Sequence, residues 1–203
     1  ELWRRFVALH RKTGKPDTER GIILVQSARS PEAEANFLQA EHYNTEEPYP
    51  YYYLARTDVN RQSRTAVQQT RLHLAIGKAV RKIAMLRVQA AGSFQQQQGQ
   101  LSAEELEELQ DLTGRTERPK QILQASLTLL KGTFTQPQEY EQDLRRLIEW
   151  YPHSLELRCS LGHLLEEQRR PDEARDHWRA ILFDFPTAME AHTGLARSLQ
   201  ALG

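Results

Sequence analysis

Apolar residues recur every three to four positions along most of this chain, a period that predicts amphipathic α-helices. The clearest example lies between residues 155 and 188, where the pattern predicts two short helices folded back on each other. Pro171 begins the second helix, because the first helical position needs no amide hydrogen. Asp172 and Glu173 follow in the first turn, where the helix dipole favours acids. The chain is therefore predicted to be all-α and built of stacked helical hairpins.

The residues that begin and end these helices recur with a fixed period. Pro152 and Pro186 stand 34 positions apart, which is the period of one class of helix–turn–helix repeat. Gly162 and Ala174 are small enough to let two helix axes approach, and large apolar side chains fill the space that remains. Residues 155–199 resemble the tetratricopeptide-repeat (TPR) family at positions that share this alternation: Leu161, Gly162, Leu165, Ala174, Trp178, Ile181 and Pro186.

The resemblance implies a short TPR-like solenoid and weakens away from its centre. Residues 119–154 keep the repeat frame without the small residues, so they are interpreted as a divergent repeat. Residues 188–202 form half a repeat, which would shield the last hairpin as a capping helix. Residues 1–34 keep a few repeat positions and are a candidate for a further divergent repeat. Three positions of the clearest repeat depart from the family: Arg158 stands where an aromatic residue is usual, Arg169 where glycine is usual and Ile181 where alanine is usual.

Three regions follow from these patterns. An N-terminal helical region spans residues 1–92 and contains a long helix at 63–91. A glutamine-rich stretch at 93–101 is a predicted linker, because its low-complexity composition cannot form a packed core. The TPR-like array then occupies residues 102–203. Its first helix is predicted to stop at Gly114, and Pro119 is predicted to begin the next one.

Two segments of the N-terminal region allow alternatives. Residues 21–27, Gly-Ile-Ile-Leu-Val-Gln-Ser, belong to a helix in the main interpretation, and a short buried strand is the alternative. Tyr49, Tyr51, Tyr52 and Tyr53 follow almost without interruption. Such rings either pack the end of the next helix or form a platform for a ligand, since each is apolar with one polar tip. Packing is the favoured interpretation.

The sequence lacks the motifs of the common catalytic sites. It has no metalloprotease helix, glycine-rich phosphate loop, nucleophile elbow or paired cysteine motif. Cys159 is the single cysteine, and together with His163 and His177 it forms the one metal-ligand set that we considered. The TPR family orients the second-helix position of His177 away from the groove, which disfavours that set. We expect no enzyme activity, cofactor or metal.

The favoured hypothesis is a scaffold or adaptor that binds a protein or peptide, or a second copy of itself, in a concave groove. In TPR proteins the first helix of each repeat lines this groove. The resemblance places these residues there: Ile122, Ala125, Leu129, Glu156, Cys159, His163, Glu166, Glu167, Glu190, Thr193 and Arg197. The lining is apolar at one end and acidic at the other. A peptide with an apolar anchor and basic residues would suit it.

The long helix at 63–91 suggests a second function. Its polar face is basic and carries Arg64, Arg71, Lys78, Arg81 and Lys82. Evenly spaced cations can follow the phosphates of a nucleic acid or contact an acidic partner. The acidic segment 103–111 could instead neutralise them within the molecule, which is the favoured interpretation.

Composition adds little on function. The 203 residues carry 27 basic and 27 acidic side chains, so net charge predicts neither nucleic acid nor membrane as a partner. No apolar run approaches the roughly 18 residues that a membrane span needs. A cytoplasmic location is expected. Since the sequence begins at Glu1, a third hypothesis is an accessory domain of a larger enzyme.

Overall fold

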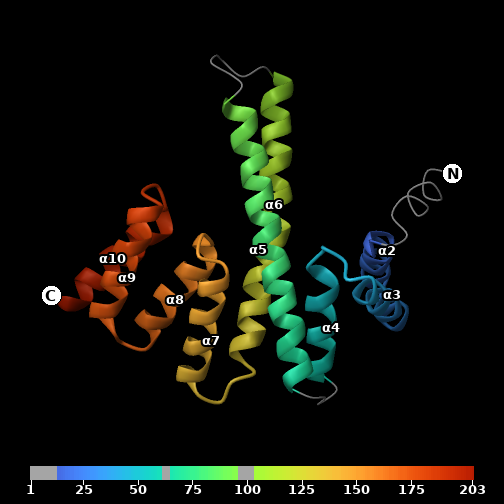
Figure 1. Ribbon diagram of the computed structural model, residues 1–203, viewed down its shortest axis with the longest axis horizontal. Helices are drawn as coiled ribbons and strands as arrows, with labels where there is room; N and C mark the ends of the chain where they lie inside the picture. Colours follow the sequence, from blue (N-terminus) through green and yellow to red (C-terminus); the bar gives the residue numbers. More distant parts are fainter. Residues whose placement is uncertain (1–12, 61–64, 96–102) are drawn as a thin grey trace. The chain divides into compact units, whose positions relative to one another are not determined.

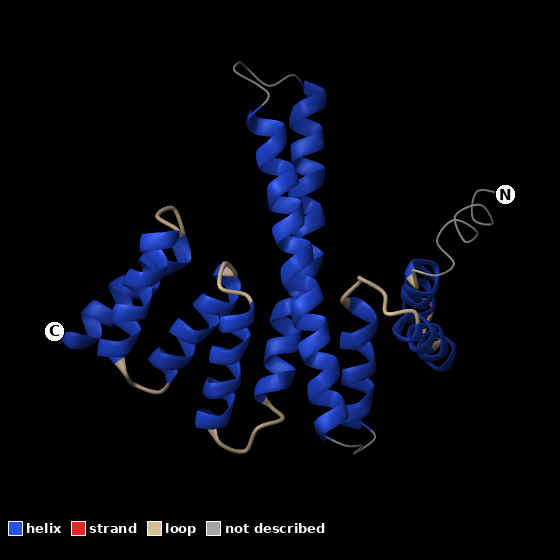
Figure 2. Cartoon of the chain, in the orientation of Figure 1, coloured by secondary structure: helices blue, strands red, loops and turns tan. Residues whose placement is uncertain are grey.

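The computed structural model describes residues 13–60, 65–95 and 103–203, with side chains described for 13–57, 66–91 and 115–203. In these ranges the chain forms α-helices joined by short loops (Figures 1 and 2). The all-α prediction is therefore confirmed. The chain divides into two compact units, Glu1–Thr133 and Phe134–Gly203, which are described separately below. The predicted linker at 93–101 lies largely outside the described residues and stays a prediction.

Unit 1 contains helices α2 to α6, and helices that follow one another in the chain pack together. Their bounds are Lys15–Gln26 for α2, Ser30–His42 for α3, Tyr49–Asn60 for α4, Thr65–Gln95 for α5 and Ala103–Lys131 for α6. The last two form a long hairpin (Figure 1). Proline stands in the first turn of α2 and of α3, where its fixed φ angle favours helix initiation. The predicted long basic helix corresponds to α5.

The alternative of a buried strand at 21–27 is wrong, because this segment belongs to α2. Thr18, Gly21 and Leu24 are buried together with Pro16, and these three recur every three positions, as one face of a helix requires. Leu24 joins Phe37 of α3 in a core cluster. A Cβ added at Gly21 would lie 2.7 Å from Cδ1 of Phe37, so the missing side chain lets α2 and α3 approach.

The predicted break between residues 113 and 119 is also wrong, since α6 continues through it with Pro119 inside the helix. An internal proline disfavours a helix by about 3 kcal/mol and glycine by about 1 kcal/mol. Packing along α5 outweighs these local preferences. Leu123, Leu127 and Leu130 are buried on α6, and Ile76 and Ile83 are buried on α5.

Two tyrosines of the cluster, Tyr51 and Tyr53, pack in the core, and a third, Tyr49, is also placed to contact a ligand. Tyr51 is buried, and its hydroxyl donates to Oδ1 of Asn44 at 3.2 Å. Tyr53 packs on Phe37 with ring centroids 4.7 Å apart. Both therefore belong to the core of unit 1. Tyr49 is half-buried, contacts Phe37 at 5.5 Å and also lines a cavity, so packing does not account for all of its ring.

Unit 2 is a run of helical hairpins. It consists of α7 (Pro137–Trp150), α8 (Leu155–Glu167), α9 (Pro171–Asp184) and α10 (Met189–Leu202). Each helix packs against the next, and α8 also contacts α10 (Figure 1). The helix start at Pro171 agrees with the sequence prediction. Ser154 caps α8, because its Oγ accepts from the amide of Leu157 at 3.4 Å.

Trp178 is the centre of the unit 2 core. It is fully buried on α9, between a glycine of α8 and a glycine of α10. A Cβ added at Gly162 would lie 2.6 Å from Cε2 of the indole, and one added at Gly194 would lie 2.6 Å from Cζ2. Neither helix could hold a side chain there without displacing the ring. This contact joins α8, α9 and α10 into one packed element.

The turn after α8 contains a strained residue. The amide of Arg170 donates to the carbonyl of Leu165, and that of Arg169 donates to the carbonyl of Glu166, each at 3.0 Å. This is the Schellman arrangement, which needs a left-handed residue. Arg169 takes that conformation at φ 57°, which costs a residue with a Cβ roughly 1–2 kcal/mol.

Arg169→Gly is therefore expected to stabilise the chain by about 0.5–1 kcal/mol, since glycine removes the strain but loses more backbone entropy on folding. Urea denaturation followed by circular dichroism measures the change. Arg179→Gly is the control, because Arg179 is exposed inside α9 and glycine there should destabilise by about 1 kcal/mol. Equal destabilisation by both substitutions would contradict the assigned turn.

Candidate functional site

Four charged or titratable side chains connect α8 to α10 on one surface of unit 2. Nε2 of His163 donates to Oε1 of Glu190 at 2.8 Å. Nη2 of Arg197 donates to Oε2 of Glu166 at 3.0 Å, and Arg197 Nη2 also lies 3.4 Å from Nδ1 of His163. We call this surface the α8/α10 face and define it by its polar residues: Glu156, His163, Glu166, Glu190, Thr193 and Arg197.

The face is held in place from the core beneath it. Nε1 of Trp178 donates to Oε1 of Glu166 at 2.9 Å, so one carboxylate satisfies the buried indole and also contacts Arg197. The ring of His163 lies edge-on to Trp178, with centroids 5.2 Å apart. Because Trp178 is fixed between two glycines, the side chains that rest on it have defined positions.

The pair formed by His163 and Glu190 shifts both pKa values. The hydrogen bond to Glu190 raises the pKa of His163 above its ordinary 6.5, although partial burial opposes it, and Glu166 adds a smaller increase. The same hydrogen bond lowers the pKa of Glu190. Because the folded chain binds the His163 proton more tightly than the unfolded chain, protonation of His163 stabilises the fold. This contribution is complete below about pH 6.5 and disappears as the pH rises through the raised pKa of His163.

Glu190→Gln is expected to lower the pKa of His163, because the amide hydrogen-bonds without a negative charge. NMR titration of the imidazole carbon-bound protons measures it directly. Glu149→Gln is the control, since Glu149 is exposed on α7. An unchanged His163 titration in Glu190→Gln would refute the contact across the two helices.

Cys159 lies under the same face and lacks the exposed, low-pKa thiol of a nucleophilic cysteine. It is buried, and burial raises the pKa of its thiol to about 12, with Glu190 and Glu156 adding to the effect. Its thiol is therefore protonated at neutral pH and unreactive. Nε2 of His177 donates to the carbonyl of Arg158 at 2.8 Å. No group of three or more histidine, cysteine or acidic residues is arranged to hold a metal in the described part of the chain.

Solved structures of TPR proteins match this chain over nearly its whole length. One is the crystal structure of YrrB, reported as a TPR protein with an unusual peptide-binding site. That match has 15% sequence identity and a TM-score of 0.43, and covers 98% of this chain and 82% of YrrB. Another is a thermophilic TPR protein from Thermus thermophilus, with 16% identity and a TM-score of 0.33, covering 92% of this chain and 99% of that one.

In unit 2 the helices pack as consecutive hairpins, the arrangement of a TPR-like fold. No protein-family model and no curated protein sequence matches the chain. The evidence for the TPR-like fold in unit 2 is its packed helical hairpins and the contact of Trp178 with two glycines.

The residues predicted for the TPR-like groove fall into three groups. Those of α8 and α10 other than Glu167 belong to the α8/α10 face, with Cys159 beneath it. Glu167 is exposed and lies near Tyr140 of α7, whose pKa is raised to about 12 mainly by burial and further by Glu167. The α6 residues Ile122, Ala125 and Leu129 belong to unit 1. Their membership of a common groove stays a prediction.

The basic stripe of α5 pairs with acids of its own unit. Arg71 donates to both carboxylate oxygens of Glu41, at 2.9 and 2.8 Å. Lys82 donates to Oε2 of Glu47 at 2.6 Å. Arg81 lies 4.0 Å from Glu46. These ion pairs argue against a nucleic-acid interface on this helix. Arg64 lies outside the described residues.

Lys78 of α5 is also paired within unit 1, and it is buried. Its side chain is buried, and burial lowers the pKa of its ammonium group. Nζ donates to Oδ1 of Asn44 at 3.2 Å, lies 3.6 Å from Glu46 and stands 5.1 Å over the ring of Tyr51. The predicted acidic partner was residues 103–111, whose side chains lie outside the described ranges. The observed acids come from residues 41–47, which the spacing along α5 could not reveal.

The described helices include none that is long and apolar enough to cross a membrane.

Proposed function

We propose that this chain is a protein-interaction scaffold whose α8/α10 face binds a basic peptide segment. A TPR-like fold is commonly a scaffold for proteins or peptides. The observation that carries the proposal is the excess of acids on this face, of which Glu166 and Glu190 are held by hydrogen bonds. The face carries three carboxylates, those of Glu156, Glu166 and Glu190, and one guanidinium, that of Arg197. It therefore has two excess negative charges while His163 is neutral.

The geometry favours binding in two ways. Glu166 and His163 are held by Trp178 before any partner arrives, which reduces the entropy lost on association. Glu190 remains 57% exposed despite its hydrogen bonds to His163 and Cys159, so its carboxylate is still accessible to a lysine or arginine of a partner. Complementary charge of this kind determines specificity and association rate more than affinity.

Charge reversal on the face tests the proposal. A fluorescein-labelled peptide of repeating Lys-Leu-Lys units serves as the probe, and fluorescence anisotropy measures its affinity. Glu190→Lys should weaken binding about tenfold, the loss expected for one charge-assisted contact. Glu149→Lys makes the same charge change on the exposed surface of α7 and should leave the affinity within about twofold, since a distant exposed charge is screened. Equal losses in the two variants would contradict a specific face.

The affinity should also depend on pH. His163 is surrounded by Glu166 of its own helix, Glu190 and Arg197 of α10, and the ring of Trp178 of α9. Its protonation adds a positive charge to the α8/α10 face. Binding of the Lys-Leu-Lys peptide should therefore strengthen as the pH rises from about 6 to about 8. His163→Asn should flatten this dependence. If His163→Asn left the pH dependence of the affinity unchanged, a group other than His163 would be responsible for it.

A further inference from the structure

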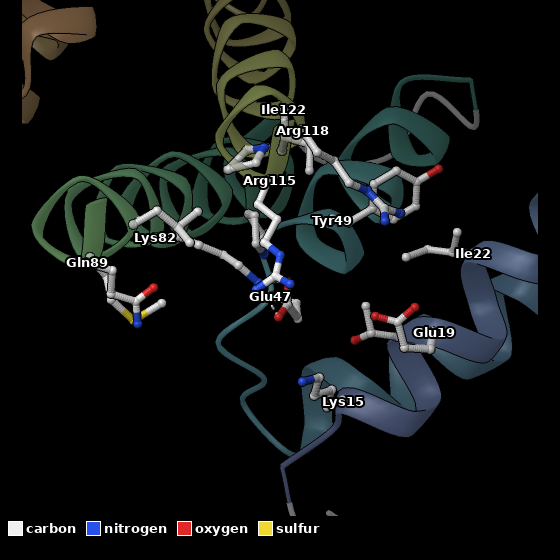
Figure 3. Close-up of a pocket in the computed structure, with 15 residues that line it drawn as sticks. Lys15, Glu19, Ile22, Glu47, Tyr49, Lys82, Gln89, Arg115, Arg118 and Ile122 are labelled. Carbon is white, nitrogen blue, oxygen red and sulfur yellow. Dashed lines mark hydrogen bonds and ion pairs between the residues drawn. The ribbon is translucent and has the colours of Figure 1, made fainter. Parts of the chain in front are cut away.

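Unit 1 contains a cavity of about 680 Å³ that none of the functions above uses. Helices α2, α4, α5 and α6 surround it, and Figure 3 shows side chains from all four elements converging on it. Its volume lies within the range of roughly 300–1,000 Å³ that is usual for ligand pockets. All its lining residues belong to unit 1.

One part of the cavity wall is apolar. Leu86 of α5 and Ile122 of α6 line it and are buried, while Ile22 of α2 is half-buried. Met85 of α5 is 50% exposed. Methionine is flexible and polarisable, and it adapts to different apolar side chains. The cavity therefore offers room and surface for one large apolar group.

The polar part of the wall is mainly cationic. Lys15 of α2, Lys82 of α5, and Arg115 and Arg118 of α6 line it, against the carboxylates of Glu19 and Glu47 (Figure 3). Lys82 already holds Glu47 at 2.6 Å. The lining thus has an excess of two positive charges. Walls of low dielectric concentrate such a field on the space between them.

Arg118 has the geometry of an anion-binding group. Its guanidinium lies 5.6 Å from the centroid of Tyr49, and Figure 3 shows the two side chains together at the cavity wall. A guanidinium stacked over a ring uses its face for that contact, and its N–H groups point outward in the plane, where they can hold a carboxylate with two hydrogen bonds. Arg118 is exposed on α6.

The distribution of these charges favours a peptide over a small acid. Lys15 and Arg118 come from different helices on two sides of the cavity (Figure 3). A ligand with two carboxylates can pair with both cations, one carboxylate with each. A segment with acids before and after a large apolar residue can place its apolar side chain against Met85 and its carboxylates at both sides. We propose that this cavity binds an acidic peptide segment through one apolar anchor, with Arg118 holding a flanking carboxylate.

Fluorescence anisotropy with a labelled peptide of repeating Glu-Leu-Glu units tests this proposal on the full chain. We expect saturable binding that Arg118→Glu and Met85→Gln each weaken about tenfold. Arg179→Glu is the control for charge, because Arg179 is exposed on α9 in unit 2, and it should bind like wild type. Circular dichroism should show that all variants keep their helix content, since both cavity residues are exposed.

Three results would overturn the proposal. One is the absence of saturable binding by the wild-type chain. Another is an equal loss in Arg118→Glu and Arg179→Glu, which would indicate attraction by overall charge alone. The third is saturable binding of decanoate that excludes the peptide, which would assign the cavity to small apolar acids. Binding of the Lys-Leu-Lys peptide should be unaffected by Arg118→Glu, so failure of this proposal is distinguishable from failure of the proposed function.

Discussion

Trp178→Ala should lower the free energy of unfolding by about 3–5 kcal/mol, as is usual for removing a buried tryptophan. The indole is fully buried and fills the space that Gly162 and Gly194 leave between three helices. Its Nε1 also holds Glu166, so the substitution releases the face as well as the core. Urea denaturation followed by circular dichroism gives the value.

Trp150→Ala is the matched control, because this second tryptophan of unit 2 is 62% exposed at the end of α7. It should change stability by less than about 1 kcal/mol. Gly194→Ala tests the same contact from the other side and should be clearly destabilising, since its Cβ would overlap the ring. A small effect of both Trp178→Ala and Gly194→Ala would exclude the proposed core.

Phe37→Ala should destabilise unit 1 by a similar amount, about 3–5 kcal/mol. Phe37 is fully buried on α3, clusters with Leu24 and Leu54, and packs on Tyr53 at 4.7 Å. Its ring also fills the space above Gly21. The loss therefore affects the packing of α2, α3 and α4 together. The same denaturation experiment measures it.

The neighbouring residue supplies the control for this substitution. Leu38 is 43% exposed, because consecutive positions of a helix face in different directions. Leu38→Ala should cost less than about 1 kcal/mol. If Leu38→Ala were as destabilising as Phe37→Ala, the assigned buried face of α3 would be wrong.

The fold of unit 2 could be predicted because local and tertiary signals agree there. Pro137 and Pro171 are local signals for a helix start and do begin helices in the fold, and Gly162 with Trp178 forms the expected small–large pair. The second small residue in contact with Trp178 was missed. A strict 34-residue frame places it at Ala196, which is exposed, whereas the packed residue is Gly194.

Unit 1 was harder to predict because its local signals conflict with its packing. Gly114 and Pro119 are helix-breaking residues, yet both lie inside α6. Only the long contact with α5 explains that continuity, and a single sequence does not show which helices meet. The β-branched and apolar run at 22–25 is ambiguous for the same reason, because a single sequence does not show that α2 packs on α3 and buries Leu24.

The candidate sites could also be predicted only in part from the sequence. The repeat frame could place His163 and Glu190 on one surface, but not their hydrogen bond, since that depends on the spacing between α8 and α10. The partners of Arg71 and Lys82 lie 30 and 35 positions earlier in the chain. The cavity of unit 1 has no local signature, because its walls come from four separate helices.

NMR chemical-shift mapping with the Lys-Leu-Lys peptide is the most direct test of the proposed binding face. Amide signals of the uniformly labelled chain are recorded while the peptide is added. The account predicts saturable shifts at Glu156, His163 and Thr193 and at their neighbours on α8 and α10, with the exposed side of α9 unchanged. Saturable shifts confined to other helices, or no saturable shifts, would contradict it.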